Sequence, residues 1–428
     1  MKIHIDLDCF FVSAERTLDP SLVGKPVAVG GRGDPYIFSE TNSRQDLLAE
    51  NTGAFVGTFF HRYEGDDLAQ YIDPDGRIRG IVTTASYEAR AFGVTTGMSL
   101  REALGRCPGL IIKAPNMRLY HRLSRALRDF LQERIPLVEQ ASIDEFYGDL
   151  EGWVEDAEVP EFTDALRHAI KRHLFLPVSI GAAHSKYISK LATDEAKPFG
   201  CRTVFPDEVG PFLRDIPVEK FPGIGRSLQR RCREYRIETL GDLLRARSLV
   251  CSWGPYAAAL YMRVNGGDPG ELTLHAPRKS IGISRTFDPV NDRDELRRRV
   301  AILARHLAYA IQRLEVHPTT FTLTLHYQHH PKAHQSLTES RFFSERRFRC
   351  LAMELFGCAD LHRGGAITHL GLAASHFSSQ TRRIFSLFDY EAASAEHTLD
   401  EATRKIRDKY GLDTLRWGDE FCSKKNSV

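Results

Sequence analysis

IHIDLDCFF, residues 3–11, is the stretch from which the fold can be worked out. Apolar side chains at positions 3, 5 and 7 alternate with polar ones, which include Asp6 and Asp8. Side chains of a strand point alternately to its two faces, so this period of two predicts a strand. The apolar face would pack inward, and both Asp residues would share the other face.

A second acidic string, SIDEFYG, lies at residues 142–148 and places Asp144 beside Glu145. Adjacent strand residues face opposite ways, so both carboxylates reach one site only near a turn or twist. If the two strings meet, their carboxylates repel one another unless cations neutralise them. Such a cluster suits Mg²⁺, and two ions roughly 3.5–4 Å apart form the sites of polymerases and nucleases. Either string alone is more often an ordinary edge strand or surface pair.

Length and composition point to a soluble protein of several domains. The 428 residues suffice for roughly three domains, and 42% hydrophobic with 27% charged residues is ordinary for globular chains. No apolar run reaches the roughly 18 residues of a membrane span, and no signal peptide is visible. The eight Cys show no CxxC spacing, so we expect free thiols and a cytoplasmic location.

The net charge of +2 conceals an uneven distribution. Residues 1–200 carry 23 basic and 29 acidic side chains, a net of −6, whereas residues 201–350 carry 25 and 16, a net of +9. An acidic half followed by a basic stretch suits a metal site beside a surface that grips a polyanion. A basic helix can equally be no more than a solvated face.

Apolar periodicity predicts alternating strands and helices, followed from about residue 205 by short helices. A C-terminal region with two strand–helix or helix–strand units suggests a small α+β sandwich. We expect a turn, a strand and a turn within 24–31, and strands at 81–84, 110–113, 176–180, 320–327 and 366–373. We expect helices at 12–16, 85–92, 99–107, 117–137, 158–174, 185–193, 292–314 and 342–356. The segment 271–282 is expected to be an extended linker.

Two further segments carry groups that suit a triphosphate. TTASYEARAFGVTTG, residues 83–97, places Tyr87 and Arg90 three apart on one helix face, with Thr84 where that helix begins. SKYISKLATDEAKPFG, residues 185–200, ends a helix with Lys197, a compact phosphate donor. Each of these side chains taken alone is as well explained by a surface helix.

FPGIG at residues 221–225 has the form of a hairpin between two helices. Its glycines allow a DNA backbone to approach, and its amides and helix end can bind phosphate. Arginines follow immediately, at positions 226, 230, 231, 233 and 236. Such a hairpin would hold a duplex without reading its sequence.

Two C-terminal segments each allow two interpretations. Residues 326–334 contain four His without neighbouring Cys or carboxylates, which favours a solvated loop over a metal site. RRIFSLFD, residues 382–389, is a short apolar stretch flanked by charge. It is either an extended peptide that docks into a partner's groove or one more buried strand.

Taken in order, IHIDLDCFF, TASYEARAFGV, SIDE, AKPFG and FPGIG resemble the Y-family translesion DNA polymerases, closest to the bacterial DNA polymerase IV type. The resemblance covers nearly the whole chain apart from residues 32–79 and the last few dozen. It implies an α+β multidomain fold, with a right-hand palm that has a central sheet, fingers and a helical thumb, plus a C-terminal α/β little finger.

The resemblance also implies domain limits. The palm would comprise 1–8 and 116–204, the fingers 9–115 with an apparent insertion at about 32–79, and the thumb 205–270. A linker at 271–282, a little finger at 283–378 and a tail at 379–428 would follow. The insertion could touch template, cover the site or bind a partner.

The resemblance assigns roles by matching position. Asp6, Asp144 and Glu145 would be catalytic and would hold two Mg²⁺ per active site with the Leu7 carbonyl, while Asp8 supports the same strand. Nucleotide-binding residues would be Phe10, Phe11, Thr84, Tyr87, Arg90 and Lys197. The ring of Phe11 would be the steric gate against ribonucleotides.

The same resemblance implies partners: primer–template DNA, deoxynucleoside triphosphates and a sliding clamp, with the protein itself a monomer. DNA-binding residues would be Gly223, Ile224, Gly225, Arg226, Arg278 and Lys279. Clamp-binding residues would be Ile384, Phe385, Ser386, Leu387 and Phe388.

The expected activity is error-prone, template-directed DNA synthesis past damaged bases. A catalytically silent adapter between DNA and clamp is the alternative, although the complete acidic set argues against it. A two-metal nuclease would have no use for triphosphate ligands or a steric gate.

Overall fold

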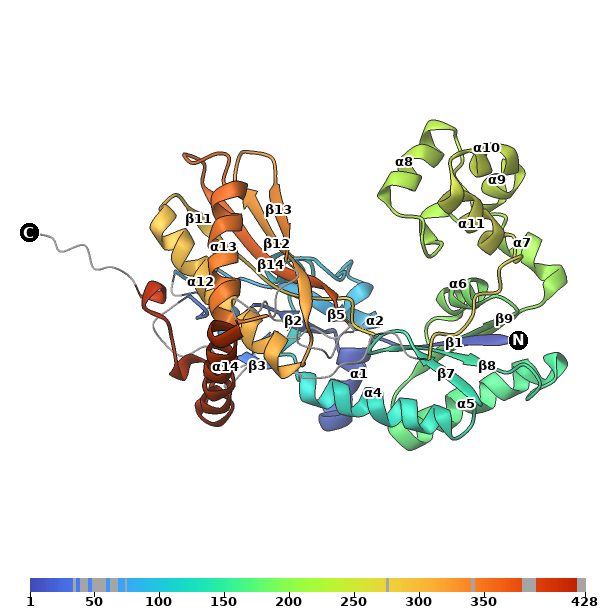
Figure 1. Cartoon of the computed structure of the whole chain (residues 1–428). Helices are drawn as coiled ribbons and strands as arrows, with labels where there is room; N and C mark the ends of the chain where they lie inside the picture. The colour runs from blue at the N-terminus through green and yellow to red at the C-terminus, as the bar shows by residue number, and fades with distance from the viewer. Residues whose placement is uncertain are drawn as a thin grey trace, which may run out of the picture. The chain divides into compact units, whose positions relative to one another are not determined.

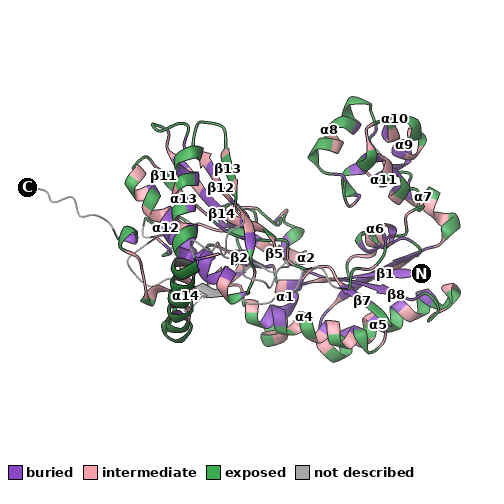
Figure 2. Ribbon diagram, in the orientation of Figure 1, coloured by how far each residue is buried: buried purple, intermediate pink, exposed green. Residues whose placement is uncertain are grey.

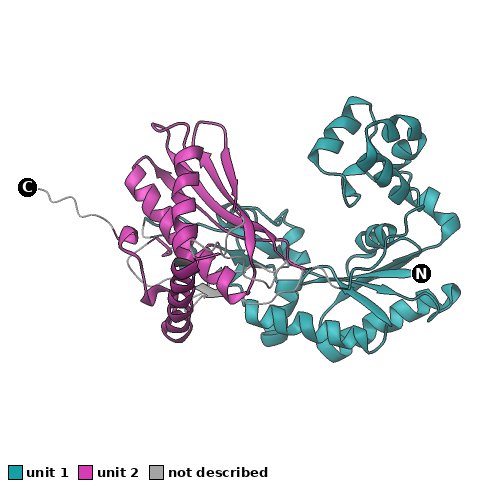
Figure 3. Ribbon diagram, in the orientation of Figure 1, with its two compact units in different colours: residues 1–31, 66–276 teal, residues 32–65, 277–428 magenta. Residues whose placement is uncertain are grey.

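The computed structural model describes residues 1–33, 36–38, 45–47, 59–61, 68–73, 75–274, 277–339, 343–378 and 390–421. The chain forms two compact units (Figure 3). Unit 1 comprises residues 1–31 and 66–276, and unit 2 comprises 32–65 and 277–428. No helix among the described residues is both long enough and apolar enough to cross a membrane.

The central sheet of unit 1 is built around the first strand. Its five strands lie in the order β10 (Cys201–Val204), β9 (Val178–Ala183), β1 (Lys2–Leu7), β8 (Glu145–Asp149) and β7 (Leu137–Gln140). β1 is antiparallel to both neighbours, and its apolar side chains Ile3, Ile5 and Leu7 are at most 1% exposed. The predicted strand and its buried apolar face are confirmed.

Helices cover both faces of this sheet (Figure 1). α4 (Met117–Gln132) and α5 (Val159–Leu174) lie on one face, and α6 (Lys186–Ala196) lies on the other. Asn116 caps α4 by accepting the Leu119 N–H at 3.1 Å, and the helix buries Leu119, Leu127 and Leu131. These apolar side chains lie along one side of α4 and share a core with the apolar side chains of the sheet.

A smaller sheet and a helical cluster complete unit 1. The sheet has the order β5 (Ile81–Ala85), β2 (Val27–Gly31) and β6 (Ile111–Lys113). Its helices are α1 (Phe10–Leu18), α2 (Tyr87–Arg90) and α3 (Leu100–Arg106). The helical cluster comprises α7 (Val209–Leu213), α8 (Arg226–Glu234), α9 (Leu240–Arg245), α10 (Arg247–Ser252) and α11 (Pro255–Val264). It has an apolar core of its own (Figure 2).

Unit 2 is a four-stranded antiparallel sheet with helices against it. The strand order is β11 (Ser280–Val290), β14 (Ile367–Phe377), β12 (Pro318–Tyr327) and β13 (Ala333–Thr338). The helices are α12 (Arg293–Arg313), α13 (Glu345–Ala359) and α14 (Tyr390–Tyr410). Residues 32–65 also belong to this unit and include two short paired strands, β3 (Gln45–Leu47) and β4 (Phe59–His61).

Buried ion pairs hold the C-terminal part of unit 2. Arg407 of α14 pairs with Glu345 of α13 at 2.6 Å, and both side chains are 1% exposed. Arg305 of α12 pairs with Glu420 and with Asp413, at 2.8 Å each. Removing one partner of such a pair would leave an uncompensated buried charge. These pairs therefore hold α14 against α13, and the segment after α14 against α12.

Most of the predicted elements are present, and two expectations were wrong. The His-rich stretch is not a loop throughout, because His326 lies in β12 and His334 in β13. β11 begins at Ser280, inside the stretch expected to be linker. The tail, for which no element was predicted, contains the 21-residue helix α14. Seven cysteines, all but Cys422, are described, and each is a free thiol, as predicted.

Candidate active site

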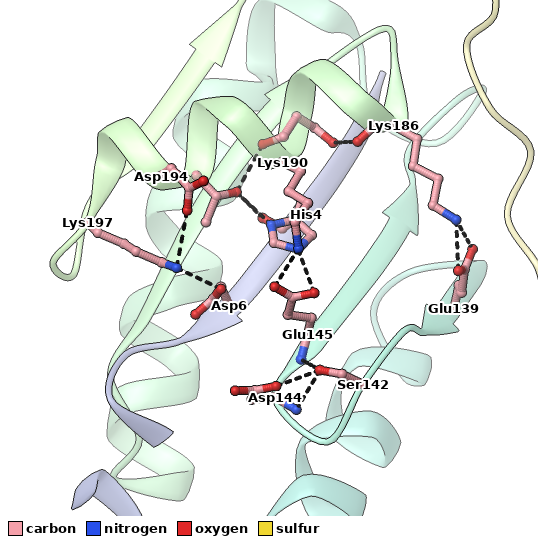
Figure 4. Close-up of polar contacts among 12 residues, drawn as sticks. His4, Asp6, Glu139, Ser142, Asp144, Glu145, Lys186, Lys190, Asp194 and Lys197 are labelled. Carbon is pink, nitrogen blue, oxygen red and sulfur yellow. Dashed lines mark hydrogen bonds and ion pairs between the residues drawn. The ribbon is translucent and has the colours of Figure 1, made fainter. Parts of the chain in front are cut away.

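The sheet register brings the two acidic strings together. Asp6 of β1 lies opposite Glu145 of β8 and, on its other side, opposite Ser179 of β9. Asp144 precedes β8, and its backbone oxygen accepts the Leu7 N–H at 3.0 Å. Three carboxylates from strings far apart in sequence therefore converge at one end of β1 (Figure 4).

A serine turn allows the adjacent carboxylates to share this site. The Ser142 hydroxyl donates to Asp144 Oδ1 at 2.5 Å and accepts the backbone N–H groups of Asp144 at 3.2 Å and Glu145 at 3.0 Å. The strand begins only at Glu145, so its alternation does not govern Asp144. The turn expected from the sequence is confirmed.

Two lysines neutralise the carboxylates (Figure 4). Lys197, which follows α6, donates to Asp6 Oδ2 at 2.7 Å and to Asp194 Oδ1 at 3.3 Å. Lys190, within α6, donates to Glu145 Oε1 at 2.5 Å. Lys190 is a site residue that was not predicted, although it lies in the predicted helix that Lys197 follows.

Burial and pairing separate the proton affinities of the three acids. Burial raises the pKa of Asp6 to about 7, against the opposing charge of Lys197. Burial also raises the pKa of Asp144, with the Ser142 hydrogen bond opposing and the Glu145 charge adding to it. Burial acts the same way on Glu145, but His4 and Lys190 outweigh it and lower that pKa to about 2. A buried carboxyl with a raised pKa is one that an added cation would stabilise.

His4 lies beneath the site on β1. Its Nε2 is 4.0 Å from Glu145 Oε2, and its Nδ1 is 2.9 Å from the Thr193 hydroxyl of α6. That hydroxyl also donates to the His4 backbone oxygen at 3.1 Å. Because burial lowers the pKa of His4, the ring is neutral near pH 7 and is a polar neighbour of both Glu145 and α6.

Asp8 lies beyond the end of β1 and is 2% exposed. Its carboxylate accepts hydrogen bonds from Ser179 at 3.0 Å, from the Phe199 N–H at 2.8 Å and from the Tyr87 hydroxyl at 3.1 Å. These contacts tie β1 to β9, to the segment after α6 and to α2. They fit a supporting role rather than metal ligation.

Two of the four predicted triphosphate ligands, Tyr87 and Lys197, contact aspartates of the first acidic string. Tyr87 reaches Asp8, and the Arg90 guanidinium lies 4.9 Å from the Tyr87 ring centroid while its Nε donates to the Ala85 oxygen. Thr84 lies in β5 rather than at the helix start, which corrects the prediction. Ser86 caps α2 instead, because its side chain accepts the Ala89 N–H at 3.2 Å.

The two phenylalanines of the first string have different environments. Phe10 is 2% exposed and packs in the core of the central sheet. Phe11 is half-buried, and its ring stacks on Tyr120 of α4 with centroids 4.4 Å apart and planes at 10°. The Tyr120 hydroxyl in turn donates to Glu15 at 2.6 Å. Tyr120 therefore fixes the Phe11 ring, a role that the sequence analysis missed.

The predicted hairpin precedes α8. Gly223 adopts φ +100°, in the left-handed region that favours glycine, and its oxygen accepts the Tyr256 hydroxyl at 2.9 Å. Ile224 is buried, whereas Gly225 is exposed. The arginines at 226, 230, 231, 233 and 236 are all exposed. The helix thus presents a basic surface next to exposed backbone.

The remaining predicted residues lie elsewhere. Arg278 is half-buried and Lys279 is exposed, just before β11 in unit 2. The clamp-binding stretch 384–388 lies outside the described residues. Within the described part of the chain, no three His, Cys, Asp or Glu side chains form a metal-holding group as they stand. At the acidic site, lysines pair with two of the three carboxylates.

The acidic site nevertheless fits hard divalent cations. All its donors are carboxylate or carbonyl oxygens, the ligands that Mg²⁺ prefers. Burial leaves Asp6 and Asp144 with raised pKa values, so a cation would relieve their mutual repulsion. Lys190 and Lys197 are long, flexible side chains that can leave the carboxylates.

Profiles of one family match both units. The profile of the impB/mucB/samB family matches residues 5–194, and that of the family's C-terminal domain matches residues 278–387. DNA polymerase IV of Glaesserella parasuis is 30% identical over 316 residues, which cover 73% of this chain and 76% of the relative. DNA polymerase IV of Bacillus velezensis is 28% identical over 97% of this chain and 92% of the relative.

Solved structures show the same fold. A Y-family DNA polymerase chimera of Dbh and Dpo4 superposes with a TM-score of 0.69 at 22% identity, covering 88% of this chain and 98% of the chimera. An insertion ternary complex of Dbh DNA polymerase gives a TM-score of 0.53. Fold and site together thus define a right-hand nucleotidyl-transferring polymerase. The chain belongs to the Y-family DNA polymerases, in the group of bacterial DNA polymerase IV.

Proposed function

We propose that this chain synthesises DNA on a template, past damaged bases, by two-metal phosphoryl transfer to a primer 3′-hydroxyl. The observation that carries the proposal is the convergence of Asp6, Asp144 and Glu145 at the end of β1. Family membership supports it, because relatives over most of the chain are named DNA polymerase IV. The intact acidic set gives the adapter alternative no support.

Asp6, Asp144, Glu145 and the Leu7 carbonyl would hold two Mg²⁺ ions. When bound, such ions stabilise the charge that develops between the attacking 3′-oxygen, the α-phosphate and the leaving pyrophosphate. The protein's own part is to orient these ligands, which the Ser142 turn and the Asp6–Glu145 register do before any substrate arrives. Preorganised ligands need little rearrangement during the reaction.

The triphosphate would lie among Thr84, Tyr87, Arg90 and Lys197, with Phe10 and Phe11 near its sugar. Lys197 would exchange its contact with Asp6 for a phosphate oxygen once a metal neutralises that carboxylate. Phe11 would exclude ribonucleotides, because Tyr120 stacking holds its ring in one place. A fixed ring can discriminate against one added hydroxyl by steric contact, whereas a mobile ring would yield.

Duplex DNA would be held by backbone contacts to Gly223, Ile224, Gly225 and Arg226. The exposed arginines of α8 would neutralise phosphates, and Arg278 with Lys279 would add contacts from unit 2. A sliding clamp would bind the peptide 384–388. The chain would act as a cytoplasmic monomer.

Primer extension with Mg²⁺ and four deoxynucleotides on an undamaged template tests the activity. Wild type should extend the primer, and Asp144→Asn should not. The matched control is Asp129→Asn, which removes an exposed carboxylate on α4 and should change nothing. Absence of extension by wild type despite DNA binding would contradict the proposal.

A lesion-containing template then tests bypass itself. The same extension reaction is run with a single damaged base, and the yield beyond the lesion is compared with that on undamaged DNA. Extension that always stops one nucleotide before the damage would leave the chain a polymerase without a bypass role.

A further inference from the structure

Residues 32–65 leave one unit and belong to the other (Figure 3). The chain completes β2 of unit 1 at Gly31, contributes residues 32–65 to unit 2, and is again part of unit 1 at residues 68–73. The chain therefore passes between the units three times, at 31/32, 65/66 and 276/277. Only the last of these passages is the linker expected from the sequence.

The first described residues of this excursion are built into unit 2. Ile37 is 4% exposed and is part of the apolar core that α12, α13 and the unit 2 sheet share. Phe38 packs against the same core, with its ring edge-on to Phe287 of β11 at 5.8 Å between centroids. Gly33 lies beside Arg285, because a Cβ added to it would be 3.4 Å from Arg285 Cδ. A solvated loop would not bury an isoleucine in this way.

Polar contacts from α12 reinforce the apolar ones. The Arg298 guanidinium donates to the Phe38 backbone oxygen at 2.7 Å. The Arg299 guanidinium lies over the rings of both Phe38 and Phe287, at 4.8 and 4.5 Å from their centroids. Glu295, one turn earlier, accepts from both arginines at 2.6 Å and so holds them in these positions.

The anchor thus combines a buried aliphatic side chain, an edge-on aromatic contact, one cation–π contact and a charge-assisted hydrogen bond. Each is modest alone. However, the anchor is covalently attached to unit 1 at Gly31, so its docking is intramolecular and benefits from a high effective concentration. An anchor whose contacts are individually weak can then remain docked most of the time.

We propose that the short segment between Gly31 and Phe38, anchored in unit 2 through Ile37 and Phe38, is a strap, a second connection that restrains unit 2 independently of the linker at 271–279. The linker alone would leave unit 2 on a single tether. With Ile37 and Phe38 seated in its core, unit 2 is held by two tethers that start from different parts of unit 1. This inference does not depend on the proposed polymerase activity.

A two-by-two experiment on the full chain separates the tethers. Fluorescent dyes are attached to Glu161→Cys on α5 of unit 1 and to the exposed native Cys358 on α13 of unit 2, with other accessible cysteines replaced by serine. Single-molecule energy transfer then reports the spread of distances between the units. One change releases the strap, Ile37→Asp, and the other inserts 20 Gly/Ser residues after Leu274. That insertion raises the root-mean-square span of a nine-residue linker by about 1.8-fold.

If the strap holds, lengthening the linker barely changes the distance distribution of the wild type. The same lengthening should broaden it by about 1.5-fold or more when Ile37→Asp is present. Leu399→Asp is the matched control, because this residue of α14 in unit 2 is 49% exposed and lies outside the core in which Ile37 is buried, and it should behave like wild type. Equal broadening by the longer linker with and without Ile37→Asp would overturn the proposal.

Folding of unit 2 is checked in each variant by thermal melting. If Ile37→Asp lowers the melting temperature of unit 2, Phe38→Ala replaces it, because that change removes the ring contacts with Phe287 and Arg299 and leaves the isoleucine in place. Phe38→Ala should also make the distance distribution sensitive to linker length. If the longer linker leaves the distance distribution unchanged in both Ile37→Asp and a folded Phe38→Ala variant, the strap is also ruled out.

Discussion

The acidic end of the unit 1 sheet and the solvent face of the unit 2 sheet both follow strand alternation, but the first carries charged side chains and the second carries uncharged ones. In unit 1, one face gathers carboxylates and lysines that burial makes strongly interacting. In unit 2, the cross-strand paired positions of the solvent face hold Ser, Thr, His, Gly and Ala, without a charged residue. They are 280, 282, 284 and 286; 369, 371, 373 and 375; 320, 322, 324 and 326; and 334, 336 and 338.

The hydroxyls of the unit 2 face pair with one another across the strands. Thr320 contacts Thr338 at 3.0 Å, Thr322 contacts Ser336 at 2.8 Å, and the His326 and His369 rings stack at 4.3 Å. A charge in a buried cluster interacts with several others, whereas a hydroxyl pair of this kind is a weak, local interaction. Single substitutions should therefore have large effects in unit 1 and small ones on the unit 2 face.

Asp6→Asn should give the largest effect. It removes a metal-binding charge and the partner of Lys197, so primer extension should fall by about three orders of magnitude, equivalent to several kcal/mol of lost charge stabilisation. Asp149→Asn is the control, since it breaks an ion pair with Lys2 at the opposite end of β1 and should leave the rate within about twofold. Comparable loss in both variants would mean that the sheet, not the site, is damaged.

The pH dependence of metal binding comes next. Since burial raises the pKa of Asp6 to about 7, this carboxyl holds a proton below pH 7 that an incoming cation must displace. The apparent Mg²⁺ affinity should fall about tenfold for each unit of pH below 7 and level off above 8. Calorimetric titration of the protein with Mg²⁺ at pH 6, 7 and 8 measures this. Equal affinities at pH 6 and pH 8 would contradict it.

The same pKa has a consequence for stability without metal. The folded-state pKa of Asp6 lies above its unfolded value of 3.8, so the folded protein binds more protons between pH 4 and pH 7. The contribution of this group to stability is therefore fully present below pH 4 and is lost as the pH rises towards 7. Added Mg²⁺ should recover stability at neutral pH.

Lys190→Gln should have an effect of intermediate size, and it should strengthen Mg²⁺ binding rather than weaken it. Lys190 donates to Glu145 at 2.5 Å and helps to lower the pKa of that acid to about 2. Removing its charge takes away a competitor for the carboxylate, so Mg²⁺ should bind about tenfold more tightly to the free protein, about 1.4 kcal/mol. Lys186→Gln is the control on the same helix, because Lys186 pairs with Glu139 instead. Weaker Mg²⁺ binding by Lys190→Gln would show that Lys190 orients Glu145 rather than competing with the metal.

The acidic site could be predicted from the sequence because its signals are local. Alternation placed Asp6 on the strand, and the adjacent pair at Asp144 and Glu145 required the turn that Ser142 supplies. Lys190 was missed because a lysine on a helix has no local sign of its partner. Thr84 was predicted at a helix start, but Ser86, directly before α2, is the capping residue, and its side chain accepts the Ala89 N–H.

Two parts of unit 2 that escaped prediction, β13 and α14, lack a strong apolar pattern, whereas β11 was missed although Ile281 and Ile283 alternate in it. β13 reads AHQSLT, and its exposed face gives no alternation of strongly apolar residues. α14 turns Arg407 inward to Glu345, so a charged pair rather than a leucine stripe fixes it. The seat of Ile37 in the core of unit 2 joins residues far apart in the sequence, and nothing near position 37 indicates it.

The smallest expected effect is on the unit 2 face, and it is best measured against α8. Thr322→Val removes the hydroxyl that contacts Ser336 while keeping the side chain's shape. If this face lies along duplex DNA, affinity should change less than about threefold, and its dependence on salt should not change. A double variant of α8, Arg230→Gln with Arg233→Gln, should instead lower the slope of log affinity against log salt by about two, because each arginine would neutralise one phosphate. Fluorescence anisotropy of labelled primer–template at several salt concentrations measures both. If Thr322→Val reduces the salt dependence of DNA affinity, this uncharged face must influence charged side chains elsewhere in unit 2. Substitutions on the unit 2 face would then no longer be small and local compared with those at the acidic site of unit 1.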